Sequence, residues 1–328
     1  MPEGRYSDKL VILDGHAVNP GDLSWDGLRA FGEVQVYAHT APSDTVAHIG
    51  DAQLVLTNKT VISAEILGAC PQIRYIGVLA TGYNVVDLSA AAARGIAVTN
   101  IPAYSTRSVA QFTFALLLEL CHHVGEHDRS VHAGDWSSCP DFCYWNTPQI
   151  ALEGKTLGIY GFGRIGRAVA AIAPAFGMRV LVYSRHPDAQ PGADVQFVDA
   201  GTLLSQSDVV SLHCPLTDET RRLINRDTLA RMKDGAMLIN TARGPLIDEA
   251  ALRDALRSGK LAGAAVDVAD SEPLPADSPL LDAPHCIITP HIAWAPLDTR
   301  RRLLEIAVQN VAAFVRGERL NRVEPSAP

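Results

Sequence analysis

The sequence predicts an α/β protein with two doubly wound parallel sheets, one in each of two domains. Three observations support this. Strand-like and helical segments alternate at short intervals over the first hundred residues, as in parallel sheets that are covered on both faces. Residues 157–185 have the pattern of a strand, a Gly-rich turn, a helix and a second strand. A long helical pattern at 298–316 comes so late that we expect it to pack back on the first domain.

The first hundred residues alternate short apolar runs with helical patterns. The next helix begins near Ser105 or Thr106, either of which can cap it, and extends to about residue 124. This helix is apolar on nearly all sides, which predicts that it is buried where one domain passes into the next. In the segment before it, we expect strands at 9–14, 33–37, 53–57, 73–78 and 96–99, and helices at 22–31, 40–49, 63–69 and 88–94.

A second α/β sheet is expected within residues 102–294, so the first domain comprises 1–101 and 295–328. The aromatic segment 134–150 is expected to be a loop that packs its rings on its own domain. A subunit contact or the rim of an active site remains an alternative for that loop. Elsewhere in this domain we expect strands at 157–160, 179–183, 209–214, 237–240, 261–268 and 286–289, and helices at 164–176, 200–206, 226–231 and 249–258.

The Gly-rich turn has the spacing GxGxxG, formed by Gly161, Gly163 and Gly166. The first glycine allows a tight turn, the second lets a pyrophosphate approach the backbone, and the third lets the helix pack close to the strand. The N-terminus of the following helix offers free N–H groups to phosphates. The motif therefore predicts a dinucleotide site, although a Gly-rich turn in an ordinary α/β domain is the alternative.

Composition argues against several classes of function. The 328 residues carry a net charge of −8, so no basic surface is expected to attract nucleic acid or an anionic membrane. No apolar run approaches the roughly 20 residues of a membrane span, and the first residues lack the pattern of a signal peptide. The six cysteines are expected to be reduced thiols in a cytoplasmic protein. We expect no metal site, because Cys139 and Cys143 lack a second pair and no carboxylate pattern accompanies His123 and His127.

Three charged or titratable residues lie just after predicted strands of the second sheet: Arg243, Glu272 and His291. Ligands of open α/β sheets bind at the carboxyl ends of strands, so these residues suggest hydride transfer to a carbonyl. His291 can supply the proton, Glu272 can orient the ring and stabilise the imidazolium, and Arg243 can bind a carboxylate and polarise the carbonyl. Considered one at a time, each residue also has a structural alternative: a buried structural histidine, an arginine that binds backbone carbonyls, and a glutamate on the surface.

Five motifs occur in order along the chain: GFGRIG at 161–166, HCPLTDET at 213–220, NTARGPLIDEAAL at 240–252, VDVADSEPL at 266–274 and TPHIAW at 289–294. Through these motifs the chain resembles the D-isomer-specific 2-hydroxyacid dehydrogenases, near their hydroxypyruvate/glyoxylate reductase and glycerate dehydrogenase branch. The resemblance covers almost the whole chain. It implies a Rossmann-type cofactor domain inserted in a flavodoxin-like substrate domain, with a cleft that closes to exclude water. It also implies a homodimer formed through the cofactor domain.

The resemblance also implies ligand-binding residues. In the first domain, Thr81 and Gly82 match the loop whose N–H groups receive the substrate carboxylate. Tyr104 lines the substrate pocket or packs in the core. Gln111 stands where many members have a glutamate. For the cofactor, the implied residues are Arg164 and Ile165 at the pyrophosphate, Cys214, Pro215 and Thr220 on the adenosine side, Thr241 and Ala242 near the nicotinamide, and Asp267 on its carboxamide.

One departure from the family pattern concerns the choice of cofactor. NAD-specific members carry an acidic residue after the second strand of the Gly-rich unit, where it binds the ribose 2′-OH. This chain has Ser184 followed by Arg185. Serine removes a charge that would repel a 2′-phosphate, and arginine can pair with that phosphate. We therefore predict NADPH in preference to NADH, with use of both as the alternative.

The predicted activity is reduction of a small 2-oxoacid, hydroxypyruvate or glyoxylate, to the D-2-hydroxyacid, and the reverse reaction. One alternative is a dehydrogenase of the same fold that acts on another small anion such as formate or phosphite. Formate-type sites pair the histidine with glutamine, so Glu272 disfavours that variant. The other alternative is a non-catalytic dinucleotide sensor. The sequence does not identify the substrate side chain.

Overall fold

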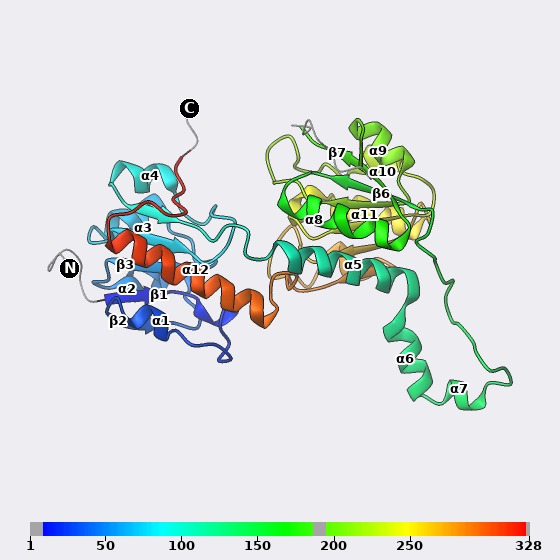
Figure 1. The fold of residues 1–328 in the computed structure, drawn as a ribbon, viewed down its shortest axis with the longest axis horizontal. Helices are drawn as coiled ribbons and strands as arrows, with labels where there is room; N and C mark the ends of the chain where they lie inside the picture. Colours follow the sequence, from blue (N-terminus) through cyan, green and yellow to red (C-terminus); the bar gives the residue numbers. More distant parts are fainter. Residues whose placement is uncertain (1–8, 186–194, 326–328) are drawn as a thin grey trace. The chain divides into compact units, whose positions relative to one another are not determined.

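A computed structural model describes residues 9–185 and 195–325 of the chain. The chain divides into two compact units (Figure 1). Unit 1 is formed by Met1–Tyr104 and Ala295–Pro328, and unit 2 by Ser105–Trp294. The first boundary lies three residues beyond the expected residue 101. His186, which follows the predicted cofactor-specificity residues, lies outside the described residues.

Unit 1 contains a parallel sheet of five strands among its described residues, in the order β2-β1-β3-β4-β5. This order reverses direction between β1 and β3, which is the flavodoxin-like arrangement. The parallel fold predicted from the alternating segments is confirmed. The strands are β1 (Lys9–Ile12), β2 (Glu33–Val36), β3 (Leu54–Thr57), β4 (Tyr75–Val78) and β5 (Ala97–Thr99).

Helices cover both faces of the unit 1 sheet. One face packs Ile49, Leu67 and Ala91 against alternate strand residues. On the other face the rings of Tyr75 and Phe314 lie 4.8 Å apart, so the last helix packs on this sheet. The helices are α1 (Asp26–Arg29), α2 (Thr45–Ile49), α3 (Ala64–Ala69), α4 (Leu88–Ala93) and α12 (Leu297–Val315), with short 3-10 helices η1 (Gly15–Ala17) and η2 (Pro42–Asp44).

Unit 2 contains a parallel sheet of seven strands within its described residues, in the order β12-β11-β10-β9-β6-β7-β8. The strand order reverses between β6 and β9, which is where dinucleotides bind in Rossmann folds. The Gly-rich turn follows β6 and therefore lies at this switch point. The strands are β6 (Thr156–Tyr160), β7 (Arg179–Tyr183), β8 (Val195–Phe197), β9 (Val209–Leu212), β10 (Ala236–Asn240), β11 (Leu261–Val266) and β12 (Cys286–Ile288).

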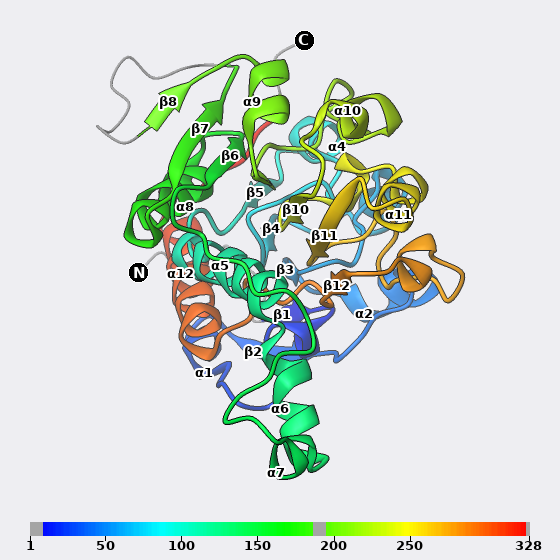
Figure 2. The same ribbon diagram turned by 90° about the vertical axis from the view of Figure 1, so that its right-hand side faces the viewer.

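The unit 2 sheet is also covered on both faces (Figure 2). Helices α5 (Thr106–His122) and α8 (Arg164–Ile172) bury their apolar residues on one face. The central strands β6, β9 and β10 are buried along their whole length and are mostly apolar, as expected for a sheet covered on both faces. The opposite face is covered by α9 (Ala200–Gln206), α10 (Arg226–Arg231) and α11 (Glu249–Arg257), and the 3-10 helices are η3 (Ala173–Phe176), η4 (Gly244–Leu246) and η5 (Pro279–Asp282).

Some predicted helices differ from the structure for local reasons. The helix expected at 22–31 is limited to α1, because the buried Asn19 side chain bonds the backbone of Gly21 and Leu23 and holds a loop there. The helix expected to reach residue 124 ends at His122, because His123 adopts a left-handed conformation with φ 46°. A further helix then begins, α6 (Val124–His132), followed by α7 (Asp135–Ser138).

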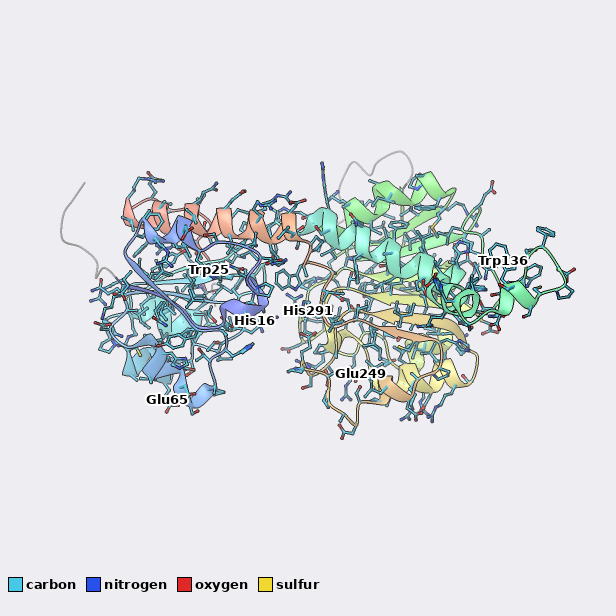
Figure 3. The ribbon with its side chains drawn as sticks, turned by 90° about the horizontal axis from the view of Figure 1, so that it is seen from below. His16, Trp25, Glu65, Trp136, Glu249 and His291 are labelled. Atoms are coloured by element: carbon cyan, nitrogen blue, oxygen red, sulfur yellow. The ribbon has the colours of Figure 1, made fainter. Side chains whose placement is uncertain are left out.

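The segment 124–146, which we call the arm, does not pack its rings as expected. Trp136, Phe142 and Trp145 are 52%, 90% and 66% exposed, and α6 has no buried residue. The expectation that this aromatic segment packs on its own domain is therefore wrong for both tryptophans. The Tyr144 ring, by contrast, is attached to α6, because its hydroxyl donates to the Ser130 hydroxyl at 2.9 Å. Trp136 and His291 lie at opposite ends of unit 2 (Figure 3), so the arm does not form the rim around that histidine in its own chain.

The described residues contain neither a membrane-spanning helix nor a cluster of metal-binding side chains. No helix among them is long and apolar enough to cross a membrane. Within the same residues, no group of three or more His, Cys, Asp or Glu side chains is arranged to hold a metal ion. His127 instead uses both ring nitrogens in the arm, at 2.9 Å from the His123 carbonyl oxygen and 3.1 Å from the Asn146 amide nitrogen.

Candidate active site

The three glycines of the turn after β6 have three different environments. Gly161 has φ 101°, and a Cβ there would lie 2.6 Å from the Cys214 backbone nitrogen. A Cβ on Gly166 would lie 2.2 Å from the Gly161 carbonyl oxygen. At Gly163, by contrast, a Cβ would meet no atom within 4 Å. The first and third glycines are therefore required by close packing, whereas the second leaves open space beside the backbone.

The open space at Gly163 lies at the start of α8. Gly163 is the N-cap of this helix and offers no side chain to its free N–H groups. Arg164 and Ile165 form the first turn, with Arg164 exposed and Ile165 partly buried. The N–H groups and the positive end of the helix dipole therefore form a cradle that fits a pyrophosphate.

Ser184 and Arg185 follow β7 beside this turn, and Arg185 is exposed. Burial raises the pKa of the Cys214 thiol to about 11, and the positive charge of Arg185 partly opposes this shift. A hydrogen bond from Thr217 lowers the pKa of Glu219, and Arg185 adds to this lowering. The guanidinium thus acts on the loop that follows β9, at the predicted adenosine side of the site.

The loop after β9 is held by its own side chains. The buried Thr220 hydroxyl lies 2.8 Å from the Pro215 carbonyl oxygen and accepts a bond of 2.7 Å from the Thr217 amide. His213 lies 2.8 Å from the Ser211 hydroxyl through Nε2. Burial lowers the pKa of His213 to about 4, so its imidazole is neutral near pH 7.

His291 and Glu272 form a direct pair in unit 2. The distance from His291 Nδ1 to Glu272 Oε2 is 2.7 Å, and the Ala269 amide donates to Glu272 Oε1 at 3.2 Å. The two side chains are 27% and 35% exposed, so a ligand can reach them. This contact orients the imidazole and leaves Nε2 as the ring nitrogen turned away from the carboxylate.

The backbone that carries His291 is folded around a buried carboxylate. His291 has φ 56°, in the left-handed region that non-glycine residues seldom adopt. Asp267, which is 1% exposed, accepts hydrogen bonds from the Thr289 hydroxyl at 2.6 Å and from the Ile292 and Ala293 amides at 2.8 and 2.9 Å. Asp267 therefore fixes the turn on both sides of the histidine, in addition to the nicotinamide role that the sequence predicts for it.

Arg243 follows β10 in a loop that a buried asparagine organises. The Asn240 side chain donates to the Arg243 carbonyl oxygen at 2.8 Å and accepts from the Ala242 amide at 3.0 Å. A Cβ on Gly244 would lie 1.9 Å from the Ala269 carbonyl group, so the Arg243 loop touches the loop that leads to Glu272. The Arg243 side chain is exposed at this edge, and Nη1 donates to the Ala242 carbonyl oxygen at 2.6 Å. The Thr241 hydroxyl in the same loop lies 3.3 Å from that of Thr113.

In unit 1, the predicted carboxylate-binding loop follows β4. The Thr81 hydroxyl donates to the Ile101 carbonyl oxygen at 2.9 Å, and the buried Asn100 side chain donates to the Thr81 carbonyl oxygen at 2.8 Å. Gly82 is the next residue, and it is partly buried. Tyr104 is 6% exposed, and its carbonyl oxygen accepts a bond from Arg302 at 3.0 Å. This burial favours the packing alternative for Tyr104.

Comparison with known proteins agrees with this geometry. Residues 114–293 match the family described as D-isomer specific 2-hydroxyacid dehydrogenase, NAD binding domain. The chain is 52% identical over 319 residues to a hydroxypyruvate reductase from Blautia hydrogenotrophica, covering 96% of this chain and 99% of that one. The chain belongs to the D-isomer specific 2-hydroxyacid dehydrogenase family. It is therefore an oxidoreductase with an NAD-binding domain, as predicted.

Two further comparisons extend this D-2-hydroxyacid dehydrogenase assignment. A glyoxylate reductase from Korarchaeum cryptofilum is 44% identical over 263 residues, which cover 78% of this chain and 77% of that protein. The structure of D-lactate dehydrogenase from Aquifex aeolicus complexed with NAD and lactic acid has a TM-score of 0.84 and 31% identity. It covers 97% of this chain and 100% of that one. Both confirm the predicted family.

The dehydrogenase site also contains residues that sequence reasoning missed. Asn240 and Gly244 lie within the NTARGP motif, but their roles depend on a buried hydrogen bond and on a contact between loops. The spacing of the motif could have drawn attention to Gly244, because it adjoins Arg243. Nothing in the sequence alone pairs Asp267 with Thr289, which lie 22 residues apart.

Proposed function

We propose that the protein uses NADPH to reduce a small 2-oxoacid, either hydroxypyruvate to the D-2-hydroxyacid or glyoxylate to its achiral 2-hydroxyacid, and catalyses the reverse reaction. The observation that carries the proposal is the contact of 2.7 Å between His291 and Glu272, in the unit that contains the Gly-rich turn. Unit 2 is then the cofactor domain and unit 1 the substrate domain. The names of the relatives, hydroxypyruvate reductase and glyoxylate reductase, support these substrates.

His291 is the proton donor in this mechanism. When hydride reaches the carbonyl carbon, the carbonyl oxygen gains negative charge and requires a proton. The imidazolium donates this proton from Nε2, because Nδ1 is held by Glu272. The carboxylate stabilises the imidazolium before transfer, and in the reverse direction the neutral imidazole accepts the proton.

Arg243 binds and polarises the substrate. Its guanidinium can pair with the carboxylate of a 2-oxoacid through two hydrogen bonds and can also stabilise the charge that develops on the carbonyl oxygen. In unit 1, the backbone N–H groups at Thr81 and Gly82 are our proposed ligands for a substrate carboxylate. Tyr104 is the other substrate-binding candidate of unit 1, and its burial favours a packing role over contact with substrate.

The nicotinamide dinucleotide supplies the hydride when bound. The N-terminus of α8 at Gly163, Arg164 and Ile165 would hold its pyrophosphate, which is supported by the open space beside Gly163. Gly161 and Gly166 support the turn itself. On the adenosine side we place Cys214, Pro215 and Thr220, and around the nicotinamide we place Thr241, Ala242 and Asp267.

NADPH is the preferred cofactor in this proposal. The residue after β7 is Ser184, which carries no charge to repel a 2′-phosphate, and Arg185 is exposed beside it. The action of the Arg185 charge on Glu219 and Cys214 supports its placement over the adenosine side. NAD is the alternative cofactor, because the matched domain family is named for NAD binding.

We expect Arg185→Ala to lower kcat/KM for NADPH about 10- to 100-fold, which corresponds to the loss of hydrogen bonds to a charged phosphate. The value for NADH should stay unchanged, because that cofactor has no 2′-phosphate. Steady-state kinetics with each cofactor, at saturating hydroxypyruvate, measures both values. Arg167→Ala is a matched control, because it removes an exposed arginine of α8 whose guanidinium lies over the Phe162 ring. An equal loss for both cofactors, or a wild-type preference for NADH, would refute the assignment.

We also propose a homodimer formed through the cofactor domain, with the arm as part of the interface. Its exposed rings, Trp136, Phe142 and Trp145, are large apolar surfaces that a partner subunit would bury. We expect light scattering to give twice the mass of the 35.1 kDa chain, and Trp145→Glu to shift it toward the monomer. A wild-type protein that stays monomeric at micromolar concentration would contradict this proposal.

Two other functions are separated by a simple assay. A dehydrogenase of another small anion would oxidise formate or phosphite and leave 2-oxoacids unchanged. A non-catalytic sensor would bind NADPH and turn over none of these acids. Absorbance of NADPH with a panel of 2-oxoacids, together with NADP⁺ reduction by formate and phosphite, distinguishes the three. The pairing of His291 with a glutamate favours the 2-oxoacid reductase.

A further inference from the structure

We propose that Glu249 is a positioning residue that holds Glu272 against His291. It lies on α11, outside the residues that would touch substrate or cofactor, and it acts by closing the base of the loop that carries Glu272. This role rests on the proposed function, because it requires the pair of Glu272 and His291 to be the acid/base group. Figure 3 labels Glu249 and His291 in the same unit.

The Glu249 carboxylate binds both ends of the loop 270–278. The Asp270 amide donates to Glu249 Oε1 at 2.8 Å, and the Ser278 hydroxyl donates to Oε2 at 3.2 Å. Ser278 is 7% exposed and also accepts a bond from the Leu280 amide at 3.3 Å. Glu272 lies between these two attachment points, so one carboxylate fixes the start and the end of its loop.

Glu249 is itself held firmly. It is the first residue of α11, and Asp248 caps this helix by accepting a bond from the Ala251 amide at 3.0 Å. Leu252 and Leu256 on the next turns are buried in the core. A carboxylate in the first turn is also stabilised by the helix dipole. Because α11 is anchored in this way, the hydrogen bonds of Asp270 and Ser278 to Glu249 hold the loop in a fixed position on the helix.

The effect on Glu272 is transmitted through one short stretch of backbone. The Asp270 amide that Glu249 binds belongs to the peptide unit that begins at Ala269. The Ala269 amide in turn donates to Glu272 Oε1, and the contact of Gly244 with Ala269 supports the same stretch from the other side. Without Glu249, the loop would lose its fixed ends, and the carboxylate would no longer be held at 2.7 Å from the imidazole.

A double-mutant cycle with Glu272→Gln tests this role. We expect Glu249→Ala to lower kcat for hydroxypyruvate reduction by roughly 10- to 100-fold, because small misplacements of a reacting group have effects of this size. The Kd of NADPH should stay unchanged. In the Glu272→Gln background, Glu249→Ala should lower kcat no further, because the carboxylate that it positions is already absent. Glu249→Gln should recover most of the activity, because its amide oxygen can still accept the Asp270 bond.

Asp248→Ala is the matched control, because it removes the neighbouring carboxylate and destabilises the same helix without touching the loop. It should lower the Tm, and it should lower kcat much less than Glu249→Ala does, because both hydrogen bonds from the loop to Glu249 remain. If Glu249→Ala does not fold, Glu249→Asp, which is one methylene shorter, replaces it in the cycle. The positioning role is overturned if kcat is unchanged in Glu249→Ala. It is also overturned if the fold losses in kcat of the two single variants multiply in the double variant. An unchanged kcat in Glu272→Gln instead overturns the proposed acid/base pair, and the role of Glu249 with it.

Discussion

Replacing His291 with asparagine is expected to lower kcat for 2-oxoacid reduction by about 100- to 10,000-fold, which is the usual contribution of a general acid. Asparagine is a better choice than alanine at this position. The backbone has φ 56° there, and asparagine tolerates the left-handed region better than most residues. The three hydrogen bonds to Asp267 come from the flanking residues and should survive the change. Steady-state NADPH oxidation measures the loss.

The dissociation constant of NADPH provides the control for His291→Asn. It should stay unchanged, because the cofactor would be bound by the Gly-rich turn and the loops after β7 and β9. Fluorescence titration of the variant gives this value independently of turnover. If the variant retained near-normal kcat with intact cofactor binding, His291 would not be the proton donor.

Replacing Arg243 with alanine is expected to lower kcat/KM for the 2-oxoacid by about 100- to 1,000-fold, as for the loss of a donor that stabilises developing negative charge. KM should rise as well, because the substrate carboxylate loses its bidentate partner. The fold should be little affected, because Asn240 holds the loop through the backbone at position 243 and not through the side chain.

Arg243→Lys separates charge from geometry in this prediction. Lysine keeps the positive charge but lacks the planar pair of donors, so we expect only part of the activity to return. The comparison uses hydroxypyruvate and a matched ketone without a carboxylate. If KM for hydroxypyruvate stayed the same in Arg243→Ala, capture of the carboxylate by this residue would be contradicted.

The parallel sheets and the family were predictable because their signals are local. Buried parallel strands are short apolar runs, and the Gly-rich turn has its own spacing, so both can be recognised within about 30 residues. The catalytic candidates were recognised for the same reason, since each follows a strand. Contact between Glu272 and His291 then follows from the parallel arrangement, because β11 and β12 are neighbours in the sheet.

Other features depend on contacts that no local pattern reveals. The strand β8 has only three residues, too few to show alternation. The end of α5 is set by the left-handed conformation of His123, a residue without a breaker signal. The exposure of Trp136 and Trp145 is opposite to what their hydrophobicity suggests, because an exposed tryptophan looks the same in sequence as a buried one.

The supporting carboxylates of the site illustrate the same limit. Asp267 and Glu249 both lie in recognisable motifs. Their hydrogen-bond donors, Thr289 and Asp270, lie 22 and 21 residues away in the sequence. Asp267 follows β11, and the three groups that donate to it follow β12. These hydrogen bonds can be recognised only once the two strands are known to be neighbours. The sequence could therefore name the candidate reacting groups but not the residues that hold them in place.

The most direct test of the account is NADPH oxidation by the wild-type protein with hydroxypyruvate, followed by chiral analysis of the product. The account predicts saturable turnover and the D-isomer of the 2-hydroxyacid. Binding of NADPH without turnover of hydroxypyruvate or glyoxylate, or formation of the L-isomer, would contradict it.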